Sequence, residues 1–165
     1  VHRGRLSPPM SITVPFDLRY EFEVKAGADE VFAVLADVPT SASHFPHVDR
    51  LVDLGDHCYR WELHKVGVAP VEIQTVYACR YMADRKKRTV RWSPLPGIGN
   101  ARIGGSWTLG GRKKSTRLVL DIQGEISVAL PGLMKAVVVP VVAGENEKLI
   151  EQYIDNLIQR FGGEV

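Results

Sequence analysis

The sequence has little of several features that would assign a chain to a known class at sight. Only two of its 165 residues are cysteines, Cys58 and Cys79. That is too few for a disulfide framework, and no Cys-x-x-Cys pair marks a zinc site. The formal net charge is +2, so overall charge gives no reason to expect nucleic-acid binding. Two isolated thiols suit a reducing compartment, and we expect a cytoplasmic protein.

Long apolar runs are also lacking. No run reaches the roughly 18 residues that a membrane-spanning helix needs, and the longest candidate, residues 136–144, contains Pro140. The basic N-terminus has no apolar segment of the kind that a signal peptide requires. We therefore interpret residues 1–13 as an N-terminal extension and residues 14–162 as a single domain. A chain of this length buries roughly 70% of its unfolded surface and needs no metal or disulfide to fold.

What the sequence does contain is alternation. Residues 16–24 alternate apolar and charged side chains, a pattern typical of a strand with one buried face. Comparable segments joined by short turns predict six further antiparallel strands, at residues 47–55, 58–66, 71–82, 88–95, 101–109 and 115–128. Gly104 and Gly105 interrupt one of them, which predicts a bulge or bend.

Helical patterns lie on either side of the six later strands. Residues 26–38 predict a short helix that Pro39 ends, and residues 40–48 predict a second short helix or a turn, stopped by Pro46. From residue 145 onward, apolar side chains recur with the period of a helix, at Leu149, Ile150, Tyr153, Ile154, Leu157, Ile158 and Phe161. Pro140 and Gly144 predict a kink, or a separate helical segment, ahead of this stripe.

This order of elements resembles the helix-grip fold of the START and birch-pollen-allergen-like superfamily, often called SRPBCC, over about residues 14–162. Three segments carry the resemblance: ADEVFAVLADV (28–38), HFPHV (44–48) and the LPG linker (130–132) before the last helix. Within the superfamily, the chain looks most like the polyketide cyclase/dehydrase and coenzyme-Q-binding-like group. The resemblance implies an α+β fold in which a seven-stranded curved antiparallel sheet wraps around the long C-terminal helix. It also implies a cavity between sheet and helix, entered through loops 66–70 and 93–100.

The residues expected to line this cavity are mostly aromatic or aliphatic, with a few hydroxyl and amide groups to orient a ligand. They are Tyr20, Phe22, Phe32, Phe45, Trp61, Leu63, Thr75, Tyr77, Trp92, Trp107, Leu118, Leu120, Val138, Val142 and Asn146. No pair of carboxylates has an inward phase, which argues against glycosidase-like chemistry. We assign no catalytic residue, metal ligand or cofactor. His44 and His47 are the best candidates for a base by pKa, but a surface role fits their turn better.

Three functions remain open on the sequence. The first is binding or transport of a small hydrophobic ligand, such as a lipid, a quinone or a polyketide-like molecule. The second is an enzyme of the polyketide cyclase or aromatase type. The third is a non-enzymatic accessory or stress-related factor that docks on a partner or a membrane surface. Weak membrane-surface contact would use two basic turns, whose lysines are Lys86, Lys87, Lys113 and Lys114. The oligomeric state is left open.

Overall fold

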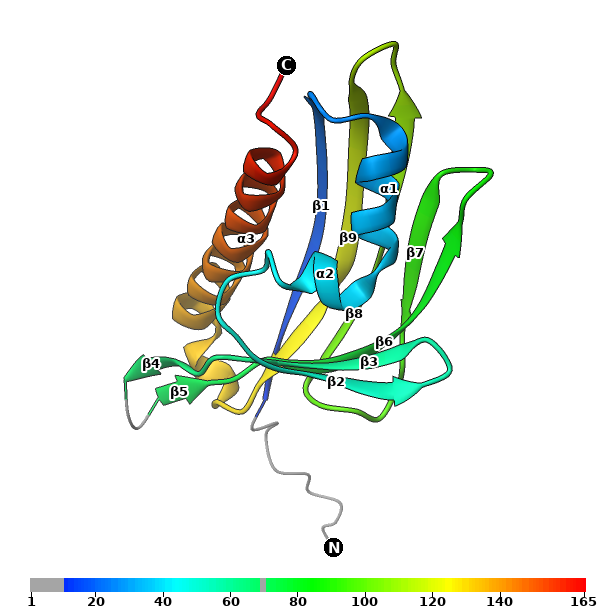
Figure 1. Ribbon diagram of the computed structural model, residues 1–165. Helices are drawn as coiled ribbons and strands as arrows, with labels where there is room; N and C mark the ends of the chain where they lie inside the picture. The colour runs from blue at the N-terminus through cyan, green and yellow to red at the C-terminus, as the bar shows by residue number, and fades with distance from the viewer. Residues whose placement is uncertain (1–10, 69–70) are drawn as a thin grey trace, which may run out of the picture.

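A computed structural model describes residues 11–68 and 71–165. The first ten residues of the predicted extension lie outside the described residues. The predicted α+β helix-grip fold is confirmed: a seven-stranded antiparallel sheet has the order β1-β9-β8-β7-β6-β3-β2, and the long helix α3 crosses its concave face (Figure 1). The elements in chain order are β1 (Ile12–Val24), α1 (Ala28–Ala36), α2 (Val38–Ala42), β2 (Val48–Gly55), β3 (Cys58–Leu63), β4 (Val66–Val68), β5 (Val71–Ile73), β6 (Val76–Asp84), β7 (Thr89–Pro94), β8 (Ala101–Gly111), β9 (Thr116–Val128), the 3-10 turn η1 (Gly132–Met134) and α3 (Lys135–Arg160).

Two strands are shorter than the alternation predicted, because the segment between them leaves the main sheet. Residues 66–68 and 71–73 pair with each other as a separate two-stranded ribbon, β4–β5, beside the start of α3 (Figure 1). At the point of departure, the Leu63 carbonyl accepts a hydrogen bond of 2.9 Å from the Gln74 side chain. The His64 amide donates to the His47 carbonyl. These bonds replace the ladder that a longer β3 would have continued.

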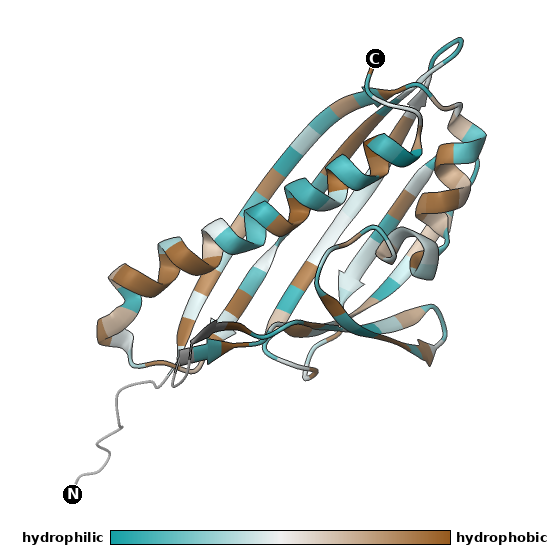
Figure 2. Ribbon diagram, turned by 60° about the vertical axis from the view of Figure 1, so that its left-hand side comes forward, coloured by the Kyte–Doolittle hydropathy of each residue, from teal (hydrophilic) through white to brown (hydrophobic). Residues whose placement is uncertain are grey.

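The C-terminal helix is longer than its apolar stripe suggested. It runs as one helix from Lys135 to Arg160, with Pro140 inside it, so the separate helical segment that was one of the two predicted alternatives does not form. Pro140 lies in the second turn and is exposed, so it removes one backbone hydrogen bond without meeting the sheet. The beginning of the helix is apolar nearly all round (Figure 2). Its buried face consists of Val138, Val142, Ile150, Tyr153, Ile154 and Leu157.

The glycine pair in β8 does not form the predicted bulge. β8 pairs with β7 and with β9 without a shift of register. Gly105 lies opposite Trp92, and a methyl group at Gly105 would come within 2.6 Å of Cζ2 of that indole. The missing side chain therefore makes room for Trp92 to lie against the concave face.

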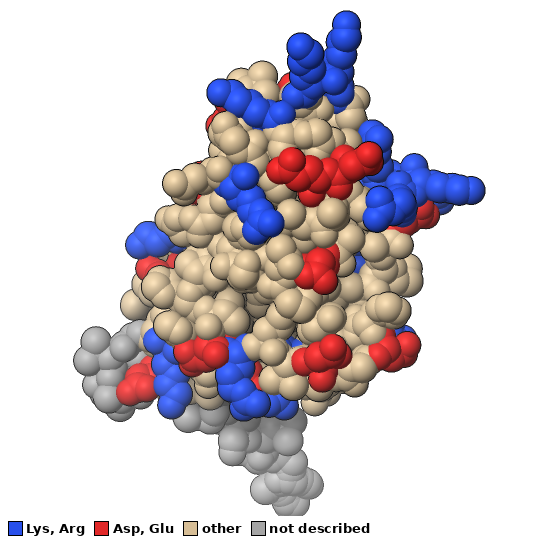
Figure 3. Space-filling view, in the orientation of Figure 1, with Lys and Arg blue, Asp and Glu red and all other residues tan. Residues whose placement is uncertain are grey.

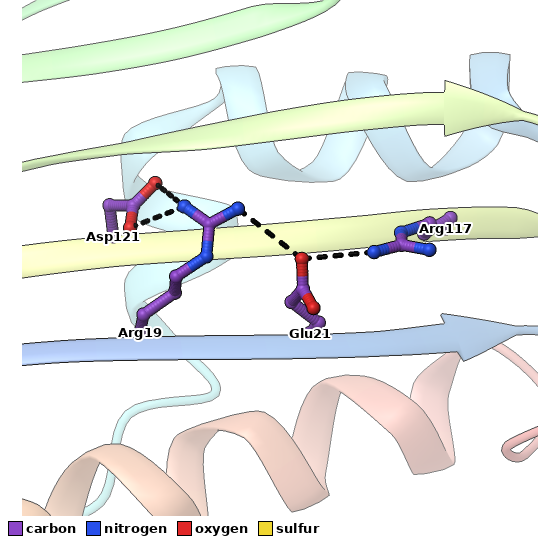
Figure 4. A network of polar contacts seen from close by, with 4 residues as sticks. All are labelled: Arg19, Glu21, Arg117 and Asp121. Carbon is purple, nitrogen blue, oxygen red and sulfur yellow. Dashed lines mark hydrogen bonds and ion pairs between the residues drawn. The ribbon is translucent and has the colours of Figure 1, made fainter.

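The charged positions of β1 face outward, as the alternation predicted. Arg19 donates to both carboxylate oxygens of Asp121 at 2.9 Å, and Arg117 donates to Glu21 at 2.9 Å (Figure 4). The hydrogen bond from Arg117 is the main cause that lowers the pKa of Glu21. All four side chains are exposed on neighbouring strands, where such pairs contribute little stability. The opposite face of the same strands is left for the core and the site.

Candidate functional site

A small cavity of about 50 Å³ lies between the concave face of the sheet, α3 and the α1–α2 segment. Its wall combines side chains from three helices and five strands, so it exists only in the assembled fold. None of the lining residues carries a charge. They are Leu35, Val38, Ser41, Phe45, Trp61, Tyr77, Tyr81, Val90, Trp92, Trp107, Leu120, Ile122, Ile150 and Tyr153.

Six of the residues expected from the sequence are brought together in this wall: Phe45, Trp61, Tyr77, Trp92, Trp107 and Leu120. The other expected residues lie elsewhere, for three reasons. Phe22, Phe32 and Leu118 pack in the core cluster near the end of α3. Leu63, Val138 and Val142 pack in the second cluster, near its beginning. The polar three, Tyr20, Thr75 and Asn146, are only partly buried and do not line the cavity.

Tyr20, Thr75 and Asn146 have their own local partners or surroundings. The Tyr20 hydroxyl donates to Glu151 at 3.4 Å on the rim of α3. Burial and the nearby carboxylates of Glu151 and Glu147 raise the pKa of this phenol to about 12. The Thr75 carbonyl accepts from the Leu63 amide at 3.0 Å. Asn146 has a buried amide nitrogen, Nδ2, without a hydrogen-bond partner among the described residues.

Eight lining residues were missed by the sequence analysis: Leu35, Val38, Ser41, Val90, Ile122, Ile150, Tyr81 and Tyr153. Five of them had a usable signal. Val90 shares strand parity with Trp92, Ile122 shares it with Leu120, and Ile150 belongs to the apolar stripe of α3. Tyr81 shares strand parity with Tyr77, so the same face should have included it. Tyr153 belongs to the apolar stripe of α3. The residues from α1 and α2 had no such signal, because the helical period of a short segment does not show which of its residues will face a cavity.

Hydroxyl groups are the polar part of the wall. The Ser41 and Tyr153 hydroxyls are hydrogen bonded at 2.5 Å. The Trp61 indole donates to the Tyr81 hydroxyl at 2.9 Å. Tyr77 is stacked on Trp61 with ring centroids 5.7 Å apart and planes inclined by 9°. Within residues 11–68 and 71–165, the Tyr77 hydroxyl forms no hydrogen bond, so the wall offers one donor to a ligand.

Burial keeps these phenols neutral. It raises the pKa of Tyr77 and of Tyr81 well above the ordinary value, because an ionised phenolate would lose its hydration. Burial also raises the pKa of Tyr153, although its hydrogen bond with Ser41 opposes part of that shift. The neighbouring Cys79 thiol has its pKa raised to about 12, mainly by burial. At neutral pH the site therefore offers hydrogen-bond donors, and neither a phenolate nor a thiolate.

Groups suited to acid–base or metal chemistry lie away from the cavity. The His44 ring bonds to the Thr40 carbonyl at 2.9 Å, and His64 pairs with Asp49 at 2.7 Å. In the described part of the chain, no group of three His, Cys, Asp or Glu side chains is placed to bind a metal ion. The arrangement can bury and orient a molecule, but its wall contains no base.

The basic turns are separate from the cavity. Lys86 and Lys87 lie in the β6–β7 turn, and Lys113 and Lys114 in the β8–β9 turn, all exposed (Figure 3). The two hairpins meet at their base, where the Leu109 amide donates to the Arg88 carbonyl at 3.0 Å. Among the described residues, no helix combines the length and the apolar character needed to cross a membrane.

No protein-family model matches the sequence, and no curated protein matches it. Solved structures do match. The Zhui aromatase/cyclase from Streptomyces sp. R1128 is 19% identical with a TM-score of 0.66, over 90% of this chain and 94% of that one. A START superfamily protein from Mycobacterium smegmatis is 17% identical with a TM-score of 0.60, over 88% and 97%. Truncated norcoclaurine synthase from Thalictrum flavum is 18% identical with a TM-score of 0.57, over 89% and 93%.

The chain has the SRPBCC/START-like helix-grip fold. At these identities the likeness shows the fold, and function has to be argued from the residues of the site. In this helix-grip chain, the residues that matter are the aromatic wall and its hydroxyl groups.

Proposed function

We propose that this protein binds a small, largely apolar molecule in the cavity between the sheet and α3. The observation that carries the proposal is the wall itself: fourteen uncharged residues, of which seven are aromatic, line one small cavity. Burying an apolar ligand there gains roughly 25 cal/mol for each Å² of apolar surface removed from water. The hydroxyl groups of Tyr77 and Ser41 supply orientation.

The size of the cavity and the groups on its wall together narrow the class of ligand proposed. At about 50 Å³ the cavity has room for a few water molecules, whereas occupied ligand sites measure roughly 300–1,000 Å³. A ligand is therefore accommodated by outward movement of lining side chains. A flat ring system suits the stacked Trp61 and Tyr77, and a carbonyl oxygen suits the unpaired Tyr77 hydroxyl. These features favour a quinone-like or polyketide-like molecule over a long-chain lipid.

Titration with prodan tests the proposal, since this neutral naphthalene dye carries one carbonyl group. We expect its emission to shift to the blue on binding. Tyr77→Phe keeps the ring and removes the hydroxyl, so it should weaken prodan binding by about five- to tenfold. The same variant should leave binding of 2-(dimethylamino)naphthalene, which lacks the carbonyl, unchanged. Absence of binding by any neutral aromatic lipophile would contradict the proposal.

A polyketide cyclase or aromatase function is the second candidate, favoured by the gathering of Ser41, Tyr77, Tyr81 and Tyr153 hydroxyls around one space. Neutral phenols can hydrogen bond to a carbonyl and polarise it. The wall has no base to take a proton from the enolising carbon, so this candidate ranks below binding. Turnover of a poly-β-ketone mimic that is lost in Tyr77→Phe would reverse the order.

Contact with an anionic membrane surface through the two basic turns is a separate proposal, supported by the exposure of their lysines. Such contact would be weak and electrostatic. Co-sedimentation with phosphatidylserine vesicles should fall when Lys86, Lys87, Lys113 and Lys114 are all changed to Gln. Co-sedimentation that survives this change would contradict the proposal.

A further inference from the structure

One segment of the chain separates the cavity from the outside. Phe45 lines the cavity and also an outer hollow of about 450 Å³. Val38 and Tyr81 each line both the cavity and a second outer hollow of about 500 Å³. Tyr59 borders both outer hollows. The walls between inside and outside are therefore single layers of side chains, and residues 38–45 supply much of them.

The same segment is held to the rest of the molecule by few bonds. The Ser41 hydroxyl bonds to Tyr153 at 2.5 Å, and the Asn156 amide nitrogen donates to the His44 carbonyl at 2.8 Å. The Phe45 ring packs on Tyr153, with centroids 5.3 Å apart. α2 is not part of the sheet and has only five residues. It packs on α1 and buries Val38 and Ala42. The end of the segment is held by these contacts with α3 and by the packing of Phe45 on Trp61, with centroids 5.7 Å apart.

The segment is bounded by two points at which the backbone leaves regular structure. Asp37 is extended, with φ −93° and ψ 100°, and separates α1 from α2. At the other end, His47 has a φ of 59°, a left-handed conformation that is uncommon for residues other than glycine. The His47 carbonyl is held by the His64 amide at 2.8 Å. Strained residues of this kind persist where the surrounding structure holds them, and they are suited to act as hinges.

Two loops, 66–70 and 93–100, were expected to form the entrance. Val66 and residues 93–100 do not line the cavity, and residues 69–70 lie outside the described part of the chain. We propose instead that residues 38–46 form a hinged lid, and that the ligand enters beneath α2 once Phe45 swings away from Tyr153. Opening joins the small cavity to the outer hollows, whose combined space is large enough for a ligand. This inference rests on the proposed binding function.

The lid is tested first without any ligand, by amide hydrogen exchange. Asn156→Ala removes the bond to His44 from a residue outside the cavity wall. Exchange should become about fivefold faster in residues 38–46, with no change in β8 and β9. Gln152→Ala is the matched control. Among the described residues, the Gln152 side chain bonds to the Asn156 side chain alone, and the bond to His44 remains. If Asn156→Ala also raises exchange in the sheet, Asn156→Ser removes the same bond with a smaller change.

Stopped-flow binding of prodan then tests the route. The association rate should rise several-fold in Asn156→Ala and stay at the wild-type value in Gln152→Ala. Equal rates in all three proteins, or unchanged exchange in residues 38–46, would overturn the lid. Faster exchange confined to the lid, combined with no prodan binding in any variant, would overturn the binding function and leave the mobile segment in place.

Discussion

Asn146 and Asn156 lie on the same helix, but their amide groups have different surroundings. The Asn156 nitrogen donates to the His44 carbonyl at 2.8 Å. The Asn146 nitrogen is buried and has no partner among the described residues. A buried donor without an acceptor costs stability, whereas its replacement by an apolar group of similar shape does not.

Asn146→Leu should therefore stabilise the protein, by about 1 kcal/mol in urea denaturation. It should also leave prodan affinity unchanged, because Asn146 does not line the cavity. Asn156→Leu is the matched comparison and should lower stability by a similar amount. A loss of stability in Asn146→Leu would show that its amide has a partner in solution.

Gly105 is the residue that admits an aromatic ring to the cavity wall. An added methyl group would come within 2.6 Å of the Trp92 ring and 2.5 Å of the Asp121 carbonyl oxygen. We expect Gly105→Ala to cost about 1–3 kcal/mol in urea denaturation, as overpacked cores do. Gly110→Ala is the control, since its nearest neighbour would be 3.9 Å away. Equal stabilities of the two variants would contradict the packing described for Trp92.

At the scale of elements, α3 covers the concave face of the sheet. The middle of this helix contains Gly144, and glycine has a low helix propensity. Gly144 is exposed, and nothing lies within 4 Å of the position of an added methyl group. Gly144→Ala should raise the free energy of unfolding by about 1 kcal/mol, the difference in helix propensity. Gly162, which follows the helix, has a φ of +85°, so Gly162→Ala should lower the free energy of unfolding. Thermal unfolding monitored by circular dichroism distinguishes the two outcomes, and a destabilised Gly144→Ala would contradict an unbroken helix.

Elements were more predictable than the site. Strict alternation in β1 and the 3.6-residue period of α3 report local geometry directly. Each element contains the residues that its pattern predicted, and each begins earlier than the pattern did. The departure of β4 and β5 from the main sheet depends on Gln74 bonding to a carbonyl on another strand, which no local pattern records. Alternation also predicts the face of the sheet on which a side chain lies. It does not predict whether that position along the strand lies beside the cavity. Phe22 and Leu118 accordingly lie on the expected face and pack beyond the cavity.

At the scale of the whole molecule, sheet, α3 and the α1–α2 segment divide the interior into two core clusters. Phe45, Tyr81, Trp92 and Ile122 pack against both clusters, and all four line the cavity. The space therefore lies where the two clusters meet, bordered by large rings that fill it imperfectly. On the proposed binding function, a flat ligand enters this junction by displacing these rings.

The central claim is that this space is the binding site, and the indole signals of a ¹⁵N-labelled sample test it most directly. The chain has three tryptophans, and Trp61, Trp92 and Trp107 all line the cavity. Titration with prodan should shift all three indole N–H resonances together, saturably and at one affinity. Three unmoved indole resonances, accompanied by backbone shifts at the exposed residues Leu133 in η1 and Val137 and Val141 in α3, would place the ligand on the surface and contradict the account.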